Sequence, residues 1–119
     1  MQYRNLGNSN LKVSTLCLGT MMFGDQTDKK EATAIVADAY ANGINYIDTA
    51  DVYTKGASET MVGEILTGQR QDWVLATKLG NPMSDRVNVG HYSRSWMMRE
   101  IDASLKRLKT DYTDILYMH

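Results

Sequence analysis

The sequence predicts an α/β fold that corresponds to the N-terminal half of a (β/α)8 TIM barrel, preceded by a β-hairpin. Short apolar segments alternate with amphipathic helical segments, as expected for parallel strands joined by helical crossovers. A doubly wound parallel sheet would show the same alternation and is therefore the alternative to a barrel. However, the first apolar segment leads into Gly-Thr-Met-Met-Phe-Gly and lacks the G-x-G-x-x-G fingerprint of such sheets. Reactive side chains also follow several separate strands, as in barrel enzymes.

The chain begins with the predicted hairpin. Tyr3 to Ser14 contains two short segments with apolar positions around the turn residues Gly-Asn-Ser-Asn at 7–10. Residues 16–20, Leu-Cys-Leu-Gly-Thr, then predict a short buried strand that ends at a glycine. Cys17 lies inside this apolar segment, and we expect it to act as a small buried hydrophobic residue.

The first predicted helix is bounded by clear capping signals. It begins at Asp28, whose carboxylate can accept from free N–H groups, while Glu31 completes the capping-box pattern. Gly43 suits the left-handed residue that follows a helix. The residues expected to face the core recur at helical spacing: Ala32, Ile35, Val36, Ala39 and Tyr40.

Two further helices follow. Ser58 is the predicted N-cap of the second helix, Gly68 its end, and Gly63 inside it carries a mild cost in helix propensity. The third helix starts near Ser93, after a polar loop that contains Pro82. The residues expected to face inward are Met61, Val62, Ile65 and Leu66 in the second helix, and Met97, Ile101, Leu105 and Leu108 in the third.

The predicted parallel strands cover residues 16–20, 46–50, 73–78 and 114–119. A complete barrel needs about 250 residues. We therefore expect residues 1–119 to form an incomplete TIM-barrel domain whose C-terminal half is absent. Its first and fourth strands would be unpaired edges, and we expect either the missing half or a second copy of the chain to cover the open side.

Composition narrows the classes of partner and compartment. Basic and acidic residues are mixed along the chain and leave a net charge of -1, which predicts binding neither to nucleic acid nor to a membrane surface. One cysteine cannot form a disulfide within the chain, and the N-terminus lacks the apolar region of a signal peptide. We expect a cytoplasmic protein without a metal site.

Four side chains of different chemistry follow successive predicted strands: Asp48, Tyr53, Lys78 and His119. Each has an ordinary structural explanation, such as a strand-end turn for Asp48 or a solvated cation for Lys78. Together they form a chemically coherent set. A phenol has a reference pKa of about 10, which an adjacent ammonium ion lowers. A carboxylate can hold that ammonium ion through a charge-assisted bond, and an imidazole can donate to a substrate carbonyl oxygen.

The segments that carry these residues resemble the aldo-keto reductases. Residues 47–59, IDTADVYTKGASE, resemble the family pattern D-T-A-x-x-Y-x-x-G-x-S-E. Residues 105–119, LKRLKTDYTDILYMH, resemble the helix and strand that lead to the family's histidine. The pattern is most similar to the branch that includes potassium-channel β-subunit-like reductases. The resemblance implies a (β/α)8 barrel that reduces an aldehyde or ketone to an alcohol with NADPH, using Asp48, Tyr53, Lys78 and His119 as the catalytic tetrad.

The resemblance also implies contacts with the cofactor, NADP(H). Residues 18–24, LGTMMFG, resemble the family's first loop, which implies that Gly19, Thr20 and Met21 lie near the nicotinamide, as does Asp48. Gln26 occurs where potassium-channel β-subunit-like members have a cofactor-contacting glutamine. The family's main phosphate and adenine contacts come from later strands, which are absent from this sequence.

Three functional hypotheses follow. The first is an NADPH-dependent carbonyl reductase. The second is a cofactor-binding regulatory subunit, because potassium-channel β subunits share the fold and the motifs. The third is an inactive fragment of the enzyme. Met21, Met22 and Phe23 are expected to form either an apolar wall of the substrate pocket or ordinary core packing.

Overall fold

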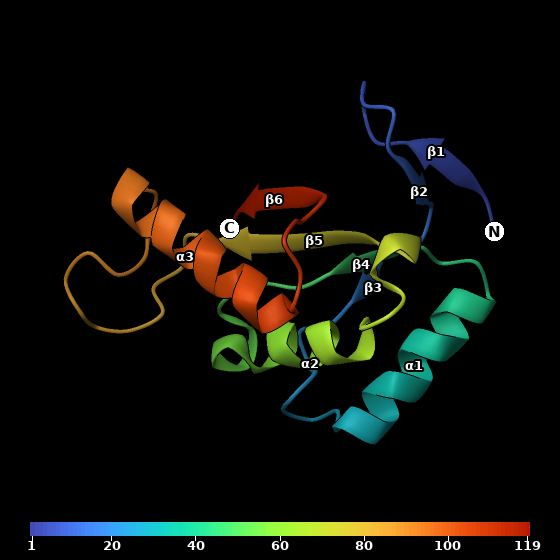
Figure 1. The fold of residues 1–119 in the computed structure, drawn as a ribbon, viewed down its shortest axis with the longest axis horizontal. Coiled ribbons are helices and arrows are strands. Elements are labelled where there is room, and N and C mark those ends of the chain that lie inside the picture. The colour runs from blue at the N-terminus through green and yellow to red at the C-terminus, as the bar shows by residue number, and fades with distance from the viewer.

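The computed structural model describes residues 1–119 and contains one parallel sheet with three helices on one side and a separate hairpin (Figure 1). The first half consists of β1 (Tyr3–Asn5), β2 (Lys12–Ser14), β3 (Leu18–Gly19), α1 (Lys29–Ala41) and β4 (Tyr46–Asp48). The second half consists of the short 3-10 helix η1 (Tyr53–Gly56), α2 (Ala57–Ile65), the 3-10 helix η2 (Arg70–Asp72), β5 (Val74–Leu79), α3 (Arg94–Leu108) and β6 (Ile115–Met118).

The four parallel strands lie in the order β3-β4-β5-β6, which is their order along the chain. A doubly wound sheet would contain a point where this order reverses. The consecutive order is that of a barrel and confirms the predicted fold class. The in-register partners Gly19 and Asp48, and Lys78 and Tyr117, place the carboxyl ends of neighbouring strands together.

Backbone hydrogen bonds continue beyond the ends of the short strands. The Thr49 N–H donates to the Ala76 carbonyl at 3.0 Å, and the Asp51 N–H donates to the Lys78 carbonyl at 3.0 Å. The His119 N–H likewise donates to the Leu79 carbonyl at 2.9 Å. These bonds fix the segments that carry reactive side chains against the central strand β5.

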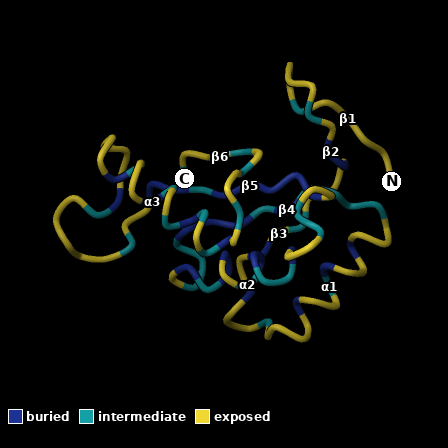
Figure 2. The backbone as a smooth tube through the Cα atoms, viewed as in Figure 1, coloured by how far each residue is buried: buried dark blue, intermediate teal, exposed yellow.

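Helix α1 begins and ends as the sequence predicts. The Asp28 carboxylate accepts a hydrogen bond from the Glu31 N–H at 2.9 Å, and Gly43 has a φ of 84° just after the helix. Its buried residues belong to the main core together with residues of the sheet, and Figure 2 shows buried positions among the exposed ones along α1. The exception is Tyr40, which was expected inside but is 46% exposed and lies against the ring of Trp73.

Helix α2 differs from the prediction at its start and in its middle. Its N-cap is Gly56, with a φ of 91°, rather than Ser58, whose hydroxyl turns inward and bonds to buried neighbours. The glycine at position 63 is more than a mild cost to the helix. A Cβ there would lie 2.5 Å from the Leu108 carbonyl carbon, so Gly63 permits the close approach of α2 and α3.

Helix α3 is capped by Ser93 as predicted, but of the four residues predicted to face inward only Leu108 is buried. The buried residues are Trp96, Glu100, Ser104 and Leu108, whereas Met97, Ile101 and Leu105 are only partly buried. A polar face is buried because Arg107 donates to both Glu100 and Ser104. Paired charges and hydroxyl groups can replace apolar contacts when their hydrogen bonds are made.

The hairpin packs at the end of the sheet where the parallel strands begin, because the Ser14 N–H donates to the Asn45 side chain at 2.8 Å. Cys17, expected to be buried, is exposed. Strand alternation places it on the same side as Gly19, the side of the sheet that bears no helix. No helix has the length and apolarity that a membrane crossing requires.

Candidate active site

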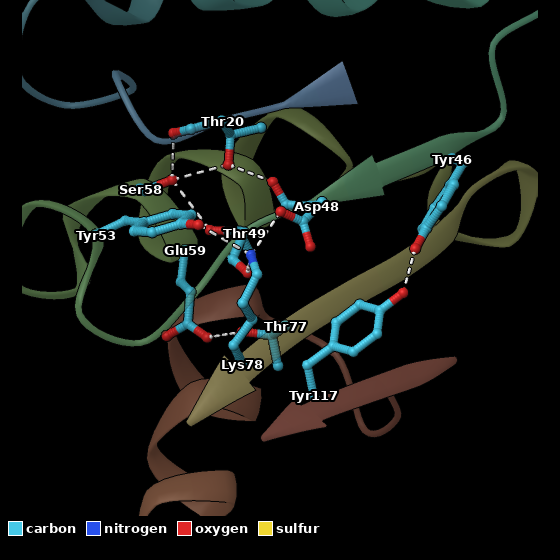
Figure 3. Close-up of polar contacts among 10 residues, drawn as sticks. All are labelled: Thr20, Tyr46, Asp48, Thr49, Tyr53, Ser58, Glu59, Thr77, Lys78 and Tyr117. Carbon is cyan, nitrogen blue, oxygen red and sulfur yellow. Dashed lines mark hydrogen bonds and ion pairs between the residues drawn. The ribbon is translucent and has the colours of Figure 1, made fainter. Parts of the chain in front are cut away.

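The predicted reactive residues lie at the carboxyl ends of neighbouring strands. Asp48 is the last residue of β4, Lys78 lies near the end of β5, and His119 follows β6. Tyr53 begins η1, the short helix that follows β4. Figure 3 shows the side chains of Asp48, Tyr53 and Lys78 pointing toward one another.

The ammonium group of Lys78 is the centre of this arrangement. Nζ lies 2.5 Å from Oδ2 of Asp48 and 3.0 Å from the Tyr53 hydroxyl, and it also donates to the Thr49 carbonyl at 2.9 Å. Burial alone would lower the pKa of Lys78, but the hydrogen bonds and charges of Asp48 and Tyr53 outweigh it and raise that pKa. The ammonium group is therefore charged at neutral pH and lies against the phenol oxygen.

His119 completes the group on the side of β6. Its ring meets the Tyr53 ring edge-on, with centroids 5.8 Å apart and planes at 86°. Burial and the neighbouring Lys78 charge lower the pKa of His119, so its ring is neutral at neutral pH. Its Nδ1 is buried and has no hydrogen-bond partner within the protein.

The proposed cofactor contacts have different environments. Gly19 is exposed beside Asp48, with open space where a side chain would be, and Met21 and Gln26 are also exposed. Thr20 is fully buried, and its hydroxyl already bonds to the Asp48 carbonyl. Gly19 therefore leaves open surface beside Asp48, while the Thr20 hydroxyl ties the end of β3 to the end of β4.

The three residues considered for an apolar wall separate into two groups. Met21 is 54% exposed and Met22 is 40% exposed, so both offer apolar surface near the strand ends. Phe23 belongs to the main core and is 3% exposed. For Phe23, ordinary core packing is the correct explanation.

A buried hydroxyl cluster behind the site was not predicted from the sequence. The Ser58 hydroxyl lies 2.9 Å from the Thr20 hydroxyl and 3.0 Å from the Thr49 hydroxyl, and donates to the Thr20 carbonyl at 2.8 Å. It ties β3, the end of β4 and α2 together. Thr49 and Ser58 both belong to the motif at residues 47–59. Their spacing in the sequence does not show that their hydroxyl groups meet in the fold.

A second polar cluster lies beneath Lys78. The hydroxyl of Thr77, the residue before Lys78, donates to Oε1 of the fully buried Glu59 at 2.5 Å. The other oxygen of Glu59 accepts from Nε of Arg107 at 2.6 Å. These bonds connect β5 to α2 and α3 and hold the strand that carries Lys78.

Two tyrosine side chains meet on the face of the sheet that carries the site. The hydroxyl groups of Tyr46 on β4 and Tyr117 on β6 lie 2.7 Å apart and span β5 (Figure 3). Burial and the hydrogen bond with Tyr117 raise the pKa of Tyr46. The pair could be predicted only after the strand order was known, because its members are 71 residues apart.

Comparison with known proteins shows the family of this chain. The family model described as "Aldo/keto reductase family" matches residues 15–119. An uncharacterized oxidoreductase of Bacillus subtilis, YqkF, is 40% identical over 100% of this chain and 39% of its own length. A probable voltage-gated potassium channel subunit beta of Arabidopsis thaliana is 42% identical over 100% of this chain and 37% of its own length.

A solved structure shows the same fold. The holo form of aldo-keto reductase AKR11C1 from Bacillus halodurans superposes with a TM-score of 0.88 at 41% identity, over 100% of this chain and 40% of that chain. The chain thus spans about two-fifths of the length of the relatives it matches. From the family match, the identities and the fold, we conclude that this chain belongs to the aldo/keto reductase family.

Proposed function

We propose that the protein containing these residues is an NADPH-dependent carbonyl reductase that converts an aldehyde or ketone to an alcohol. The observation that carries this proposal is the position of the Lys78 ammonium group, which bonds to both the Asp48 carboxylate and the Tyr53 phenol. A phenol beside a fixed cation can give up its proton more readily as charge develops on a nearby carbonyl oxygen.

In this proposal each residue of the tetrad has a distinct role. Tyr53 protonates the carbonyl oxygen, Lys78 stabilises the negative charge left on the phenol, and Asp48 holds the Lys78 side chain in place. His119, which is neutral at neutral pH, donates a hydrogen bond that orients the substrate carbonyl. When bound, the reduced nicotinamide supplies the hydride.

The cofactor would lie against the open carboxyl edge of β3 and β4. We assign its nicotinamide end to Gly19, the backbone of Thr20, Met21 and Asp48, because Gly19 pairs in register with Asp48 and the next two residues continue from it. The resemblance of the first loop adds a further contact from Gln26, which is exposed. The remaining contacts of NADP(H) would come from the second half of the barrel. That half, or a second copy of the chain, would also cover the side of the sheet that bears no helix.

A second candidate is a cofactor-binding regulatory subunit. It is favoured by the 42% identity to the probable potassium channel subunit beta of Arabidopsis thaliana. Such a protein would bind NADPH without rapid turnover of aldehydes.

The test is the loss of NADPH absorbance when the full-length protein is mixed with NADPH and an aromatic aldehyde, and the same measurement with NADH tests cofactor preference. Turnover above the rate without protein is expected. Tight NADPH binding without turnover of any aldehyde or ketone would support the regulatory function, and absence of both would contradict either proposal.

A further inference from the structure

Asp51 is a buried carboxyl group that the proposed mechanism does not use. It is fully buried, and neither of its side-chain oxygens pairs with another side chain. Its backbone N–H donates to the carbonyl of Lys78 at 3.0 Å, and Tyr53 follows only two residues later. Residue 51 therefore joins the backbone of Lys78 to the turn that carries Tyr53.

The groups around Asp51 do not pair with it. Arg107 on α3 instead donates from Nε to Glu59 on α2 at 2.6 Å. One of its terminal nitrogens donates to Glu100 at 2.5 Å and to the Ser104 hydroxyl at 3.1 Å, both on α3. The region thus contains three carboxyl groups and one guanidinium group. The Lys78 ammonium is already bonded to Asp48 and Tyr53.

An ionised carboxylate in this position would be costly. Burial, followed by the nearby charge of Glu100 and then of Glu59, raises the pKa of Asp51 from its ordinary value of 3.8 to about 7, although the Val52 backbone and Arg107 act in the opposite direction. Asp51 is therefore protonated in mildly acidic solution and becomes charged near neutral pH.

The turn above Asp51 has strained backbone. Thr54 and Lys55 both have left-handed conformations, with φ of 49° and 53°, which are unfavourable for residues with a Cβ. Such a turn keeps its shape only while its contacts with the rest of the protein hold it. The bonds near its start include those from the Asp51 N–H to the Lys78 carbonyl and from the Tyr53 N–H to the Ala50 carbonyl.

We propose that Asp51 is a positioning residue that keeps the phenol of Tyr53 against Lys78 while its carboxyl group is protonated, and that its ionisation loosens this turn and lowers turnover. This inference rests on the proposed reductase function. It predicts that the ionisation of Asp51 produces an inflection in the pH dependence of turnover, separate from the proton transfer by Tyr53.

The effect on stability has a definite sign. Because the carboxyl group binds its proton more tightly in the folded state, wild-type stability is unaffected by Asp51 below about pH 3.8, falls between there and about pH 7, and stays reduced above it. Asp51→Asn is neutral at every pH and has nearly the same shape. Its melting temperature should match that of the wild type in acid and exceed it at alkaline pH.

The experiment compares the wild type, Asp51→Asn and the matched control Asp102→Asn, which changes an exposed carboxylate of α3, in the full-length protein. The wild type and the control should lose turnover severalfold as the pH rises through about 7, with KM changing less than kcat. Asp51→Asn should keep its turnover through this range. An unaltered inflection in Asp51→Asn would overturn the positioning role.

A measurement that needs no activity separates this inference from the proposed function. The 13C resonance of the Asp51 carboxyl group, assigned by comparison with Asp51→Asn, should titrate near pH 7 in the wild type. Titration in the ordinary range of an exposed aspartate would overturn the inference even if the protein reduces aldehydes. If the resonance titrates near pH 7 in a protein without reductase activity, the proposed function fails and the protonated state of Asp51 stands.

Discussion

The Tyr53 hydroxyl accepts a hydrogen bond from Lys78 Nζ at 3.0 Å. Tyr53→Phe removes that hydroxyl while keeping the ring that contacts His119. In the full-length protein we expect kcat for carbonyl reduction to fall by about a hundredfold or more, because the general acid is lost, while NADPH affinity stays nearly the same.

The matched control is Tyr40→Phe, which removes an exposed hydroxyl from α1. Steady-state kinetics and a fluorescence titration with NADPH distinguish the two variants. Retention of more than about a tenth of wild-type turnover by Tyr53→Phe would remove this residue from the acid role.

Lys78→Met tests the cation rather than the proton donor. The substitution keeps an unbranched side chain of similar length but removes the charge that bonds to Asp48 and Tyr53. We expect a loss of kcat comparable to that of Tyr53→Phe and a changed pH profile. The exposed Lys30→Met serves as the control. A pH profile identical to that of the wild type would argue against coupling between the ammonium and the phenol.

Gly63 on α2 lies against the backbone of Arg107 and Leu108 at the end of α3. Helix propensity alone predicts that Gly63→Ala stabilises the protein by about 1 kcal/mol. The new Cβ would instead lie 2.5 Å from the Leu108 carbonyl carbon, a backbone atom that cannot rotate away. We expect the free energy of unfolding to decrease by about 1–3 kcal/mol, as for other overpacked interiors.

The sign of the change in unfolding free energy shows whether helix propensity or the close Cβ contact dominates. Urea unfolding measures it, with the slope of the free energy against denaturant checked for constancy. Ala37→Gly on the exposed face of α1 measures the propensity term alone. An increase in stability for Gly63→Ala would show that the helices can separate without cost.

Strands β3 and β6 are the two edges of the parallel sheet. Three consecutive apolar residues of β6 are exposed: the exposed fraction is 39% for Leu116, 37% for Tyr117 and 60% for Met118. Unpaired backbone groups next to exposed apolar residues form a template for further strand pairing. We therefore expect residues 1–119, produced alone, to form oligomers or aggregates and to lack aldehyde reduction.

Size-exclusion chromatography with light scattering tests this expectation, together with thermal unfolding. Charge substitutions offer an internal comparison, because Leu116→Lys and Met118→Lys on the edge strand should reduce association. A monodisperse monomer with a cooperative thermal transition, formed by unaltered residues 1–119, would show that the open edges need no partner.

Local signals in the sequence accounted for the element order, two of the helix caps and the positions of the reactive residues. The caps at Asp28 and Ser93 were predictable because the polar side chain and the N–H group it accepts from are three residues apart. Helical crossovers between short apolar segments predicted parallel strands, and the missing G-x-G-x-x-G fingerprint together with reactive residues after separate strands predicted the consecutive order of a barrel. Once that order is known, the carboxyl ends of the strands must lie together, which is why Asp48 and Lys78 could be paired in advance.

Contacts between distant segments could not be predicted in this way. The buried face of α3 depends on Arg107 reaching Glu59, 48 residues away, and this contact favours a polar interior that apolar periodicity does not reveal. The inward turn of Ser58 and the exposure of Cys17 likewise depend on which segments pack against them. Chain spacing specifies which residues can share a face, but burial and hydrogen-bond partners are set by neighbours that meet only when the chain folds.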